Sequence, residues 1–199
     1  MVEHLEFLVE ELSMEALLHG LLPNLLAVQT YDIRVFQGKP DLLRKLPQRL
    51  KGYTSAFHAL TKIIVLVDRD TDDCIALKRQ LEQIATRAGV RTRSKPDWEG
   101  RFTIINRIVI EELEAWYFGD WQAVRAAYPK APGRLPPKYR YPDAIHGGTW
   151  EAFERVLKMR SGLNKVEAAR RIEPHFDPQR NTSPSFRCFC EALTGLINE

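Results

Sequence analysis

Hydrophobic and polar residues follow two different periods along the chain. Four runs have the pattern of β-strands, and the residues between them carry leucines at helical spacing. The third run, KIIVLVD, holds five consecutive aliphatic residues, which is typical of a central strand buried on both faces. The strand-like runs lie at residues 4–10, 31–37, 62–68 and 101–110.

The alternation of strand and helix predicts an α/β fold with a largely parallel sheet flanked by helices. We expect this domain to occupy residues 1–127. Residues 128–148 are rich in Pro and Gly, so they cannot form a long helix. Helices are expected again at about 149–160 and 164–173. Residues 128–199 should therefore form a loop and a helical extension that pack on the α/β domain.

Local signals predict where several helices begin and end. Ser13 is a candidate N-cap for the helix after the first strand, and Pro23 should disturb that helix near its end. Gly89 should end the helix that follows the third strand. The last helix should have Ser183 as its N-cap and Pro184 at its first position.

The cysteines and the apolar segments argue against several classes of protein. The three cysteines (Cys74, Cys188 and Cys190) form no CxxC pair, so neither a disulfide framework nor a zinc site is indicated. No apolar stretch approaches the roughly 18 residues of a membrane span, and the first residues are acidic, unlike a signal peptide. We therefore expect a reduced, cytoplasmic protein that does not associate with a membrane.

Charge is distributed unevenly along the chain. Residues 1–129 hold 17 Lys and Arg against 18 Asp and Glu, whereas residues 130–171 hold 10 Lys and Arg against 4 Asp and Glu. A basic segment after an acidic region would suit a phosphate-bearing polymer. The same asymmetry could also come from an ordinary solvated helical face.

Acidic residues follow three of the predicted strands. They are Glu10 and Glu11 after the first strand, Asp68, Asp70, Asp72 and Asp73 after the third, and Glu111, Glu112 and Glu114 after the fourth. Parallel strands deliver their carboxyl ends to one edge of a sheet, and two like charges about 4 Å apart repel by about 4 kcal/mol at an effective dielectric constant near 20. A divalent cation with a preference for oxygen ligands, Mg²⁺ or Mn²⁺, would relieve this repulsion.

Ordinary structural roles would explain some of these acids. Asp70 or Asp72 could cap the helix that follows, and Asp73 could be a favourable charge at the start of that helix. The three glutamates after the fourth strand could form an acidic first helical turn. Helix capping accounts for only part of the cluster, so metal binding is the favoured hypothesis for the rest.

Several known metal and phosphate motifs fit the sequence poorly. An EF-hand loop that starts at Asp68 would need Gly and Glu where the chain has Asp73 and Arg79. Haloacid-dehalogenase-like phosphatases, the weak runner-up, also use Asp-x-Asp, but with Thr or Val at the position of Asp72. Sugar-nucleotide transferases use Asp-x-Asp with a metal, but no nucleotide-binding pattern supports them. The chain has no P-loop, no GxGxxG and no HExxH, and its histidines are scattered.

Two stretches of the chain resemble the Toprim domain of topoisomerases, bacterial primases and the overcoming-lysogenization-defect nucleases. In FLVEELSMEALL a first strand ends in V-E before an acid-led helix, and in IVLVDRDTDD a later strand ends in D-x-D. Toprim domains often have Gly after V-E, where this chain has Glu11. The stretches QGKPDLLRKLPQRLKGY, IEELEAWYFGD and NKVEAARRI also resemble a bacterial Toprim-like family of unknown function.

The resemblance implies a role for each matching acid. Glu10 would be a metal ligand or a general acid or base, and Asp68 and Asp70 would bind the metal. Asp72 would be a third acid of the D-x-D motif, and Glu114 would be an additional acid of the nuclease branch. The implied activity is hydrolysis of phosphodiester bonds in DNA or RNA with Mg²⁺ or Mn²⁺.

Further expectations concern basic residues and partners. Some Toprim-like proteins place a lysine near the scissile phosphate, and Lys39 and Lys165 are candidates, although either could be a surface lysine. Arg180 and Asn181 should instead help to dock the last helix. The resemblance also implies an effector of phage defence or of a mobile element that works beside an ATPase partner. The alternative is a catalytically silent module that binds a metal, nucleic acid or a partner protein.

Overall fold

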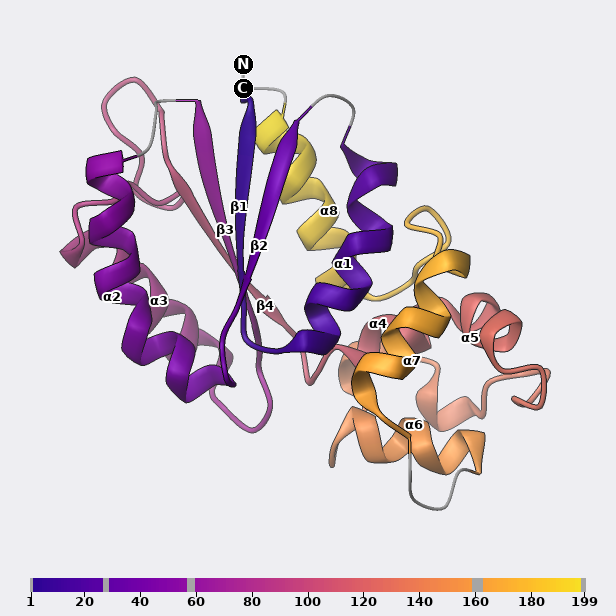
Figure 1. Cartoon of the computed structure of the whole chain (residues 1–199). Coiled ribbons are helices and arrows are strands. Elements are labelled where there is room, and N and C mark those ends of the chain that lie inside the picture. Colours follow the sequence, from indigo (N-terminus) through magenta and orange to yellow (C-terminus); the bar gives the residue numbers. More distant parts are fainter. Residues whose placement is uncertain (1, 27–28, 57–59, 159–162, 198–199) are drawn as a thin grey trace.

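A four-stranded, all-parallel sheet forms the centre of the protein (Figure 1). The computed structural model describes residues 2–26, 29–56, 60–158 and 163–197. The strands are β1 (His4–Val9), β2 (Thr30–Val35), β3 (Thr61–Asp68) and β4 (Ile104–Val109), in the order β2-β1-β3-β4. Every residue of β3 is buried, as the aliphatic run predicts. The predicted α/β fold is thus confirmed.

Helices cover both faces of the sheet (Figure 1). On one face lie α1 (Leu12–Leu25) and α8 (Pro184–Ile197), and on the other lie α2 (Lys39–Ala56) and α3 (Cys74–Arg87). Because side chains of a strand point alternately to opposite faces, Phe7 enters the core on the α1 and α8 side and Leu8 enters the core under α2 and α3. The sheet is therefore the middle of three layers.

The remaining helices gather at the carboxyl end of the sheet (Figure 1). They are α4 (Glu114–Gly119), α5 (Trp121–Ala127), α6 (Thr149–Leu157) and α7 (Lys165–Ile172), with 3-10 turns at Pro137–Tyr139, Pro142–Ala144 and Glu173–His175. One hydrophobic core runs from β1 and α1 into α4, α6, α7 and α8. The extension therefore shares its core with the sheet.

Docking of α8 depends on an aromatic cluster and on buried hydrogen bonds. The Trp116 ring lies 4.9 Å from that of Phe186, and its indole N–H donates to Ser185 Oγ at 3.1 Å. Asn181 Nδ2 donates to the Trp116 carbonyl oxygen at 2.8 Å. Ser183 Oγ accepts from the Phe186 N–H at 3.2 Å. The expected N-cap role of Ser183 is confirmed, and Asn181 holds the segment that leads into α8.

The ends of several elements differ from the sequence-based expectations. The Ser13 prediction is wrong, because α1 begins at Leu12 and its N-cap is Glu11, whose carboxylate accepts from the Ser13 hydroxyl. Pro23 lies in the last turn of α1, where it does not end the helix. Gly89 has a φ of 79° just after α3 and ends that helix as predicted. Strand β4 is shorter than the strand predicted at residues 101–110, because Arg101 to Thr103 belong to the preceding loop.

Replacing Asp120 with Ala should destabilise the extension. This fully buried carboxylate caps α5, accepts from the Asp177 N–H at 2.8 Å and forms two bonds with Arg180, at 2.6 and 2.8 Å. We expect a loss of about 3 kcal/mol in the free energy of unfolding, because Arg180 and the N-terminus of α5 both lose the carboxylate that they bind.

Urea denaturation measures this loss, with Glu167→Ala as the control. The Glu167 ion pair with Arg171, at 2.7 Å, is exposed and should contribute no more than about 0.5 kcal/mol. Equal losses in the two variants would contradict the structural role assigned to Asp120.

Candidate metal centre at the carboxyl edge of the sheet

The candidate site lies between β1 and β3, where the direction in which strands are added to the sheet reverses. After β1 the chain moves outward to β2 through α1, and α2 then returns across the other face to β3. In doubly wound sheets the carboxyl ends of two such strands form the crevice in which ligands bind. Glu10 directly follows β1, and Asp68 is the last residue of β3. The topology thus brings together two acids that are 58 residues apart in the chain.

Glu10 and Asp68 are close and buried. The Asp68 N–H donates to Glu10 Oε2 at 3.3 Å, and the Leu113 N–H donates to Asp68 Oδ2 at 3.3 Å. Burial, followed by the charges of Glu10 and Glu114, raises the pKa of Asp68 well above its usual range. Burial and the Asp70 charge raise the pKa of Glu10 to about 7. Both groups therefore keep their protons to a higher pH than an ordinary surface acid does.

Glu114 and Tyr117 extend the site inward from Asp68. Both are fully buried, and burial is the main reason that the pKa of Glu114 rises to about 8. Within the described part of the chain, Asp68 Oδ1, both Glu114 carboxyl oxygens and the Tyr117 hydroxyl make no hydrogen bond. Unpaired buried polar atoms are costly and rare in folded proteins. A small region of unpaired polar atoms thus lies behind the sheet edge.

Lys39 pairs with the second and third acids of the D-x-D motif. It begins α2, and its Nζ lies 2.8 Å from Asp70 Oδ2 and 2.7 Å from Asp72 Oδ2, and donates to the Arg69 carbonyl oxygen at 3.0 Å. Burial alone would lower the pKa of Lys39, but the bonds to Asp70 and Asp72 outweigh this effect and raise the pKa. Lys39 is therefore a buried member of the site.

Lys165 approaches the acids from the opposite side. It is the first residue of α7, and its Nζ lies 3.5 Å from Glu112 and 4.0 Å from both Glu11 and Glu114. Burial would lower its pKa, but the charges of Glu114, Glu11 and Glu112 raise the pKa overall. The two lysines proposed from the sequence thus lie at the same sheet edge, one on each side of the buried acids.

Two residues at this edge have unusual backbone conformations. Asp70 has a φ of 50° and Glu111 a φ of 64°, both in the left-handed region, which costs a non-glycine residue about 1 kcal/mol. The Asp70 N–H donates to the Glu111 carbonyl oxygen at 2.8 Å, and the Glu111 side chain pairs with Arg69. The strained turns after β3 and β4 therefore support each other, and they direct Asp70 toward Lys39.

The structure decides between the structural roles considered for the acids. The Ala76 N–H donates to Asp73 Oδ1 at 2.7 Å, so Asp73 caps α3 and the capping role considered for Asp70 or Asp72 is wrong. An acidic first turn exists only for Glu114, since α4 begins there. Glu112 Oε2 instead accepts from the Trp150 N–H and the Thr149 hydroxyl, both at 3.0 Å. Glu112 thus holds the N-terminus of α6 at the edge of the site.

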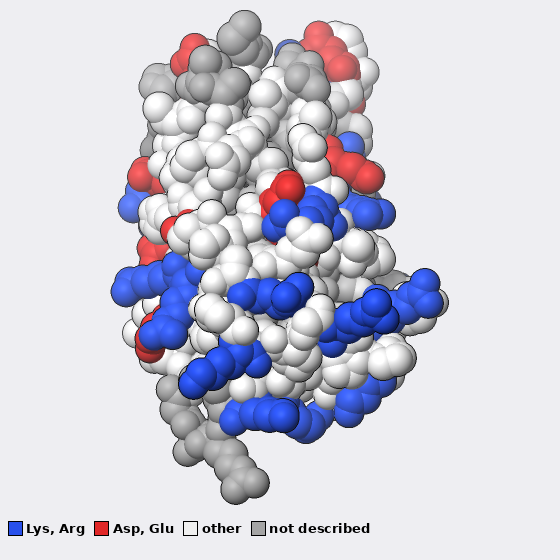
Figure 2. Space-filling view, turned by 90° about the vertical axis from the view of Figure 1, so that its right-hand side faces the viewer, with Lys and Arg blue, Asp and Glu red and all other residues white. Residues whose placement is uncertain are grey.

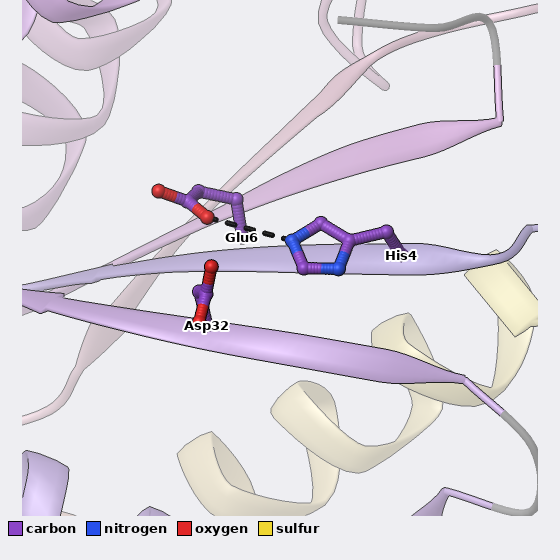
Figure 3. Close-up of side chains that lie close together, drawn as sticks. All are labelled: His4, Glu6 and Asp32. Atoms are coloured by element: carbon purple, nitrogen blue, oxygen red, sulfur yellow. Dashed lines mark ion pairs between the residues drawn. The ribbon is translucent and has the colours of Figure 1, made fainter.

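A separate group of side chains lies on the α2 face of the sheet. His4, Glu6 and Asp32 place ligand atoms within 4.8 Å of one another (Figure 3). Arg34 already neutralises this group, because its Nε lies 3.0 Å from Glu6 and its Nη2 lies 2.9 Å from Asp32. A cation would have to displace that arginine, so we assign the group a role in joining β1 to β2.

The chemistry of the edge acids fits a hard divalent cation. Their ligands are carboxylates, and Asp68 Oδ1 is a buried oxygen without a hydrogen bond. Among the described residues, the edge acids do not converge within 4.8 Å in threes, since Lys39 and Lys165 pair with several of them. Asp70 would have to turn away from Lys39 to share an ion with Glu10 and Asp68. Its side chain, 45% exposed, has room to do so.

Tyr117 was not anticipated from the sequence. It lies three residues after Glu114 in α4, and such spacing is common between ordinary core residues. Its position against Asp68 and Glu114 depends on how α4 packs on the sheet, which a single sequence does not show.

The stability of the metal-free protein should fall as the pH rises from about 5 to about 8. The folded state binds protons at Glu114 and Glu10 more tightly than the unfolded chain, because burial raises both pKa values, to about 8 and about 7. Glu82 and Glu112, whose pKa values are lowered, titrate mainly below this range and contribute little to the slope.

Urea denaturation in the presence of a chelator tests this dependence. Glu114→Gln should remove part of the loss, while Glu151→Gln, at an exposed position on α6, should leave it unchanged. A stability that is flat or rises between these pH values in the native protein would contradict the assigned burial of the acids.

Comparison with known proteins gives one match. The family model described as a domain of unknown function (DUF4276) matches residues 9–194. No curated protein and no protein of solved structure shows significant similarity to the chain. No helix in the described part of the chain is long and apolar enough to cross a membrane. Since the match spans nearly all of the sequence, from the end of β1 into α8, the chain belongs to the DUF4276 family.

Proposed function

We propose that the protein is a divalent-metal-dependent nuclease that hydrolyses phosphodiester bonds of DNA or RNA. The observation that carries the proposal is the meeting of Glu10 and Asp68 at the reversal point of the sheet, beside buried oxygens without hydrogen bonds. The V-E and D-x-D stretches that resemble the Toprim domain supply these residues. They end neighbouring parallel strands, which supports the resemblance.

In this proposal, Glu10, Asp68 and Asp70 hold Mg²⁺ or Mn²⁺. When bound, the ion lowers the pKa of a coordinated water and neutralises charge on the phosphate. If Glu10 acts as the general acid or base and leaves the ion to Asp68 and Asp70, its raised pKa, about 7 without metal, suits proton transfer near neutral pH. Asp72 and Glu114 are further candidate ligands, on the solvent side and the inner side of Asp68.

The two lysines would position the substrate. Lys39 and Lys165 are positively charged at neutral pH, because neighbouring carboxylates raise both pKa values. A phosphate that reaches the edge would compete with Asp70 and Asp72 for Lys39. Lys39 would then stabilise negative charge on the phosphate. Once its ion pair with Lys39 is broken, Asp70 would be free to face Glu10 and Asp68.

The observed ion pairs also favour a second candidate function. Lys39 already neutralises Asp70 and Asp72, and Lys165 lies near three further acids, so the edge can be stable without a cation. A catalytically silent module that recognises nucleic acid or a partner ATPase would need only this arrangement. The two functions differ in whether metal binding is accompanied by cleavage.

Asp68→Asn should abolish metal-dependent cleavage. With plasmid, single-stranded DNA and RNA as substrates and Mn²⁺ or Mg²⁺ present, we expect at least about a 100-fold loss of rate, because the central ligand loses its charge. Asp73→Asn is the matched control, since Asn also caps helices well and this residue only caps α3. Absence of cleavage by the native protein, or equal rates in the native protein and Asp68→Asn, would exclude the nuclease.

Metal binding separates the nuclease from the silent module. Calorimetric titration of chelator-treated protein with Mn²⁺ should show binding in the native protein and in Asp73→Asn, and greatly weakened binding in Glu10→Gln and Asp68→Asn. Binding with no cleavage of any substrate would support the module. The absence of Mn²⁺ binding in the native protein would contradict the metal centre itself.

A further inference from the structure

A second candidate site lies on the extension, away from the acids. The C-terminal ends of α5, α6 and α7 enclose a pocket of about 580 Å³, a size in the usual range of ligand sites. Tyr128, Lys130, Leu157, Lys158 and Arg171 are among the residues that line it. None of the described residues that line it is acidic. The pocket therefore combines an apolar floor with three cations.

The surroundings of the pocket are also basic. Figure 2 shows the face that carries α5 and α7, and Lys and Arg side chains spread over its lower half with few acids between them. The exposed basic residues in the described part of 125–171 are Arg125, Lys130, Arg134, Lys138, Arg140, Arg155, Lys158, Arg170 and Arg171. Such a surface attracts a polyanion and is complementary in charge to a phosphate backbone.

Tyr128 gives the pocket an aromatic wall. The Tyr128 ring packs edge-on against Phe153, with 6.2 Å between the ring centres, and the Arg171 guanidinium carbon lies 5.8 Å from the centre of the Tyr128 ring. Backbone bonds on both sides fix the residue, since its N–H donates to the Val124 carbonyl oxygen and its own carbonyl oxygen accepts from Ala131, both at 2.8 Å. An aromatic ring beside arginine is the arrangement on which unpaired bases stack.

Lys158 occupies a position where glycine is the usual residue. It follows α6 in a left-handed conformation, with φ 55° and ψ 29°. A residue with a side chain is strained there, and Lys158 is one of the residues that line the pocket. A strained residue at a concave basic site indicates a role for the side chain itself.

Helix α7 connects this pocket to the acid edge. Lys165, at its start, lies among Glu11, Glu112 and Glu114, and Arg171, near its end, lines the pocket. Six residues of helix span about 9 Å, which is roughly the rise of three nucleotides along one strand. A strand held at the pocket could therefore reach the acids along α7.

We propose that the pocket binds a nucleotide unit of single-stranded nucleic acid and directs the strand toward the acid edge. Its base stacks against Tyr128 and Arg171, and its neighbouring phosphates contact Lys130 and Lys158. This inference rests on the proposed nuclease function. It adds a defined anchoring site and a preference for single strands over duplexes.

Binding of a fluorescent 12-nucleotide oligomer, measured by anisotropy with chelator present, tests the pocket without cleavage. Replacing Lys130, Lys158 and Arg171 with Gln should weaken binding at least about tenfold and reduce the salt dependence, because each lost phosphate contact lowers the slope by about 0.7. Tyr128→Ala should weaken binding about tenfold and leave the salt slope unchanged. Tyr128→Phe, which keeps the aromatic ring, should bind with the affinity of the native protein.

The matched control replaces Arg79, Arg87 and Lys95 with Gln. These residues line a pocket along α3, on the opposite face of the sheet, which also contains Glu82. This variant should bind the oligomer within about twofold of the native protein. Equal losses in the two triple variants would overturn the pocket in favour of a diffuse charge effect.

Lys158→Gly separates binding from folding. Glycine relieves the left-handed strain, so the melting temperature should stay the same or rise, while the affinity for the oligomer should fall several-fold. Unchanged affinity in this variant, tighter binding of a duplex of equal length, or equal competition by a mononucleotide would each overturn the proposal.

The test distinguishes failure of the pocket from failure of the nuclease. Asp68→Asn should bind the oligomer as the native protein does, because it alters only the acid edge. Cleavage by the native protein, with unchanged oligomer binding in the pocket variants, would leave the nuclease standing and remove the pocket. Oligomer binding at the pocket without cleavage would support the pocket and exclude the nuclease.

Discussion

Burial of carboxylates at one edge of a parallel sheet, together with their mutual repulsion, is the constraint on which this structure depends. The edge brings Glu10, Asp68 and Glu114 into a region with little water, and their raised pKa values express the cost of ionising them. Two lysines from different parts of the chain offset this repulsion, Lys39 at the solvent side and Lys165 beside Glu114. Each of these lysines is the first residue of its helix, so the packing of α2 and α7 on the sheet places both cations at the edge.

The hydrophobic pattern was sufficient to predict the sheet and the place of the acids. A short continuous aliphatic run rich in β-branched residues is typical of a buried strand, and parallel strands that end in acids bring those acids to one edge. The positions of Glu10 and Asp68 therefore required no knowledge of side-chain packing. The identity of the helix cap was harder to predict, since Asp70, Asp72 and Asp73 are equally good caps by residue type and only Asp73 performs this role.

Features that depend on the extension could not be predicted from one sequence. The resemblance named Lys165 as a candidate, but this residue is about 50 positions beyond Glu114, and nothing in its local sequence indicates that α7 folds back against the sheet edge. The burial of the Tyr117 hydroxyl and the contact between Glu112 and α6 also depend on long-range packing, which the local sequence does not show. The left-handed turns at Asp70 and Glu111 were equally hidden, because neither position carries the glycine that usually marks such a conformation.

The position of α8 has a consequence for folding during synthesis. This helix covers one face of the sheet beside α1, and its aromatic side chains pack against Trp116 of α4. A nascent chain that ends before Pro184 would expose that face and leave Trp116 without its neighbours. We therefore expect the carboxyl edge to reach its final form only after α8 has left the ribosome, although the acids of the edge were synthesised at least about 70 residues earlier.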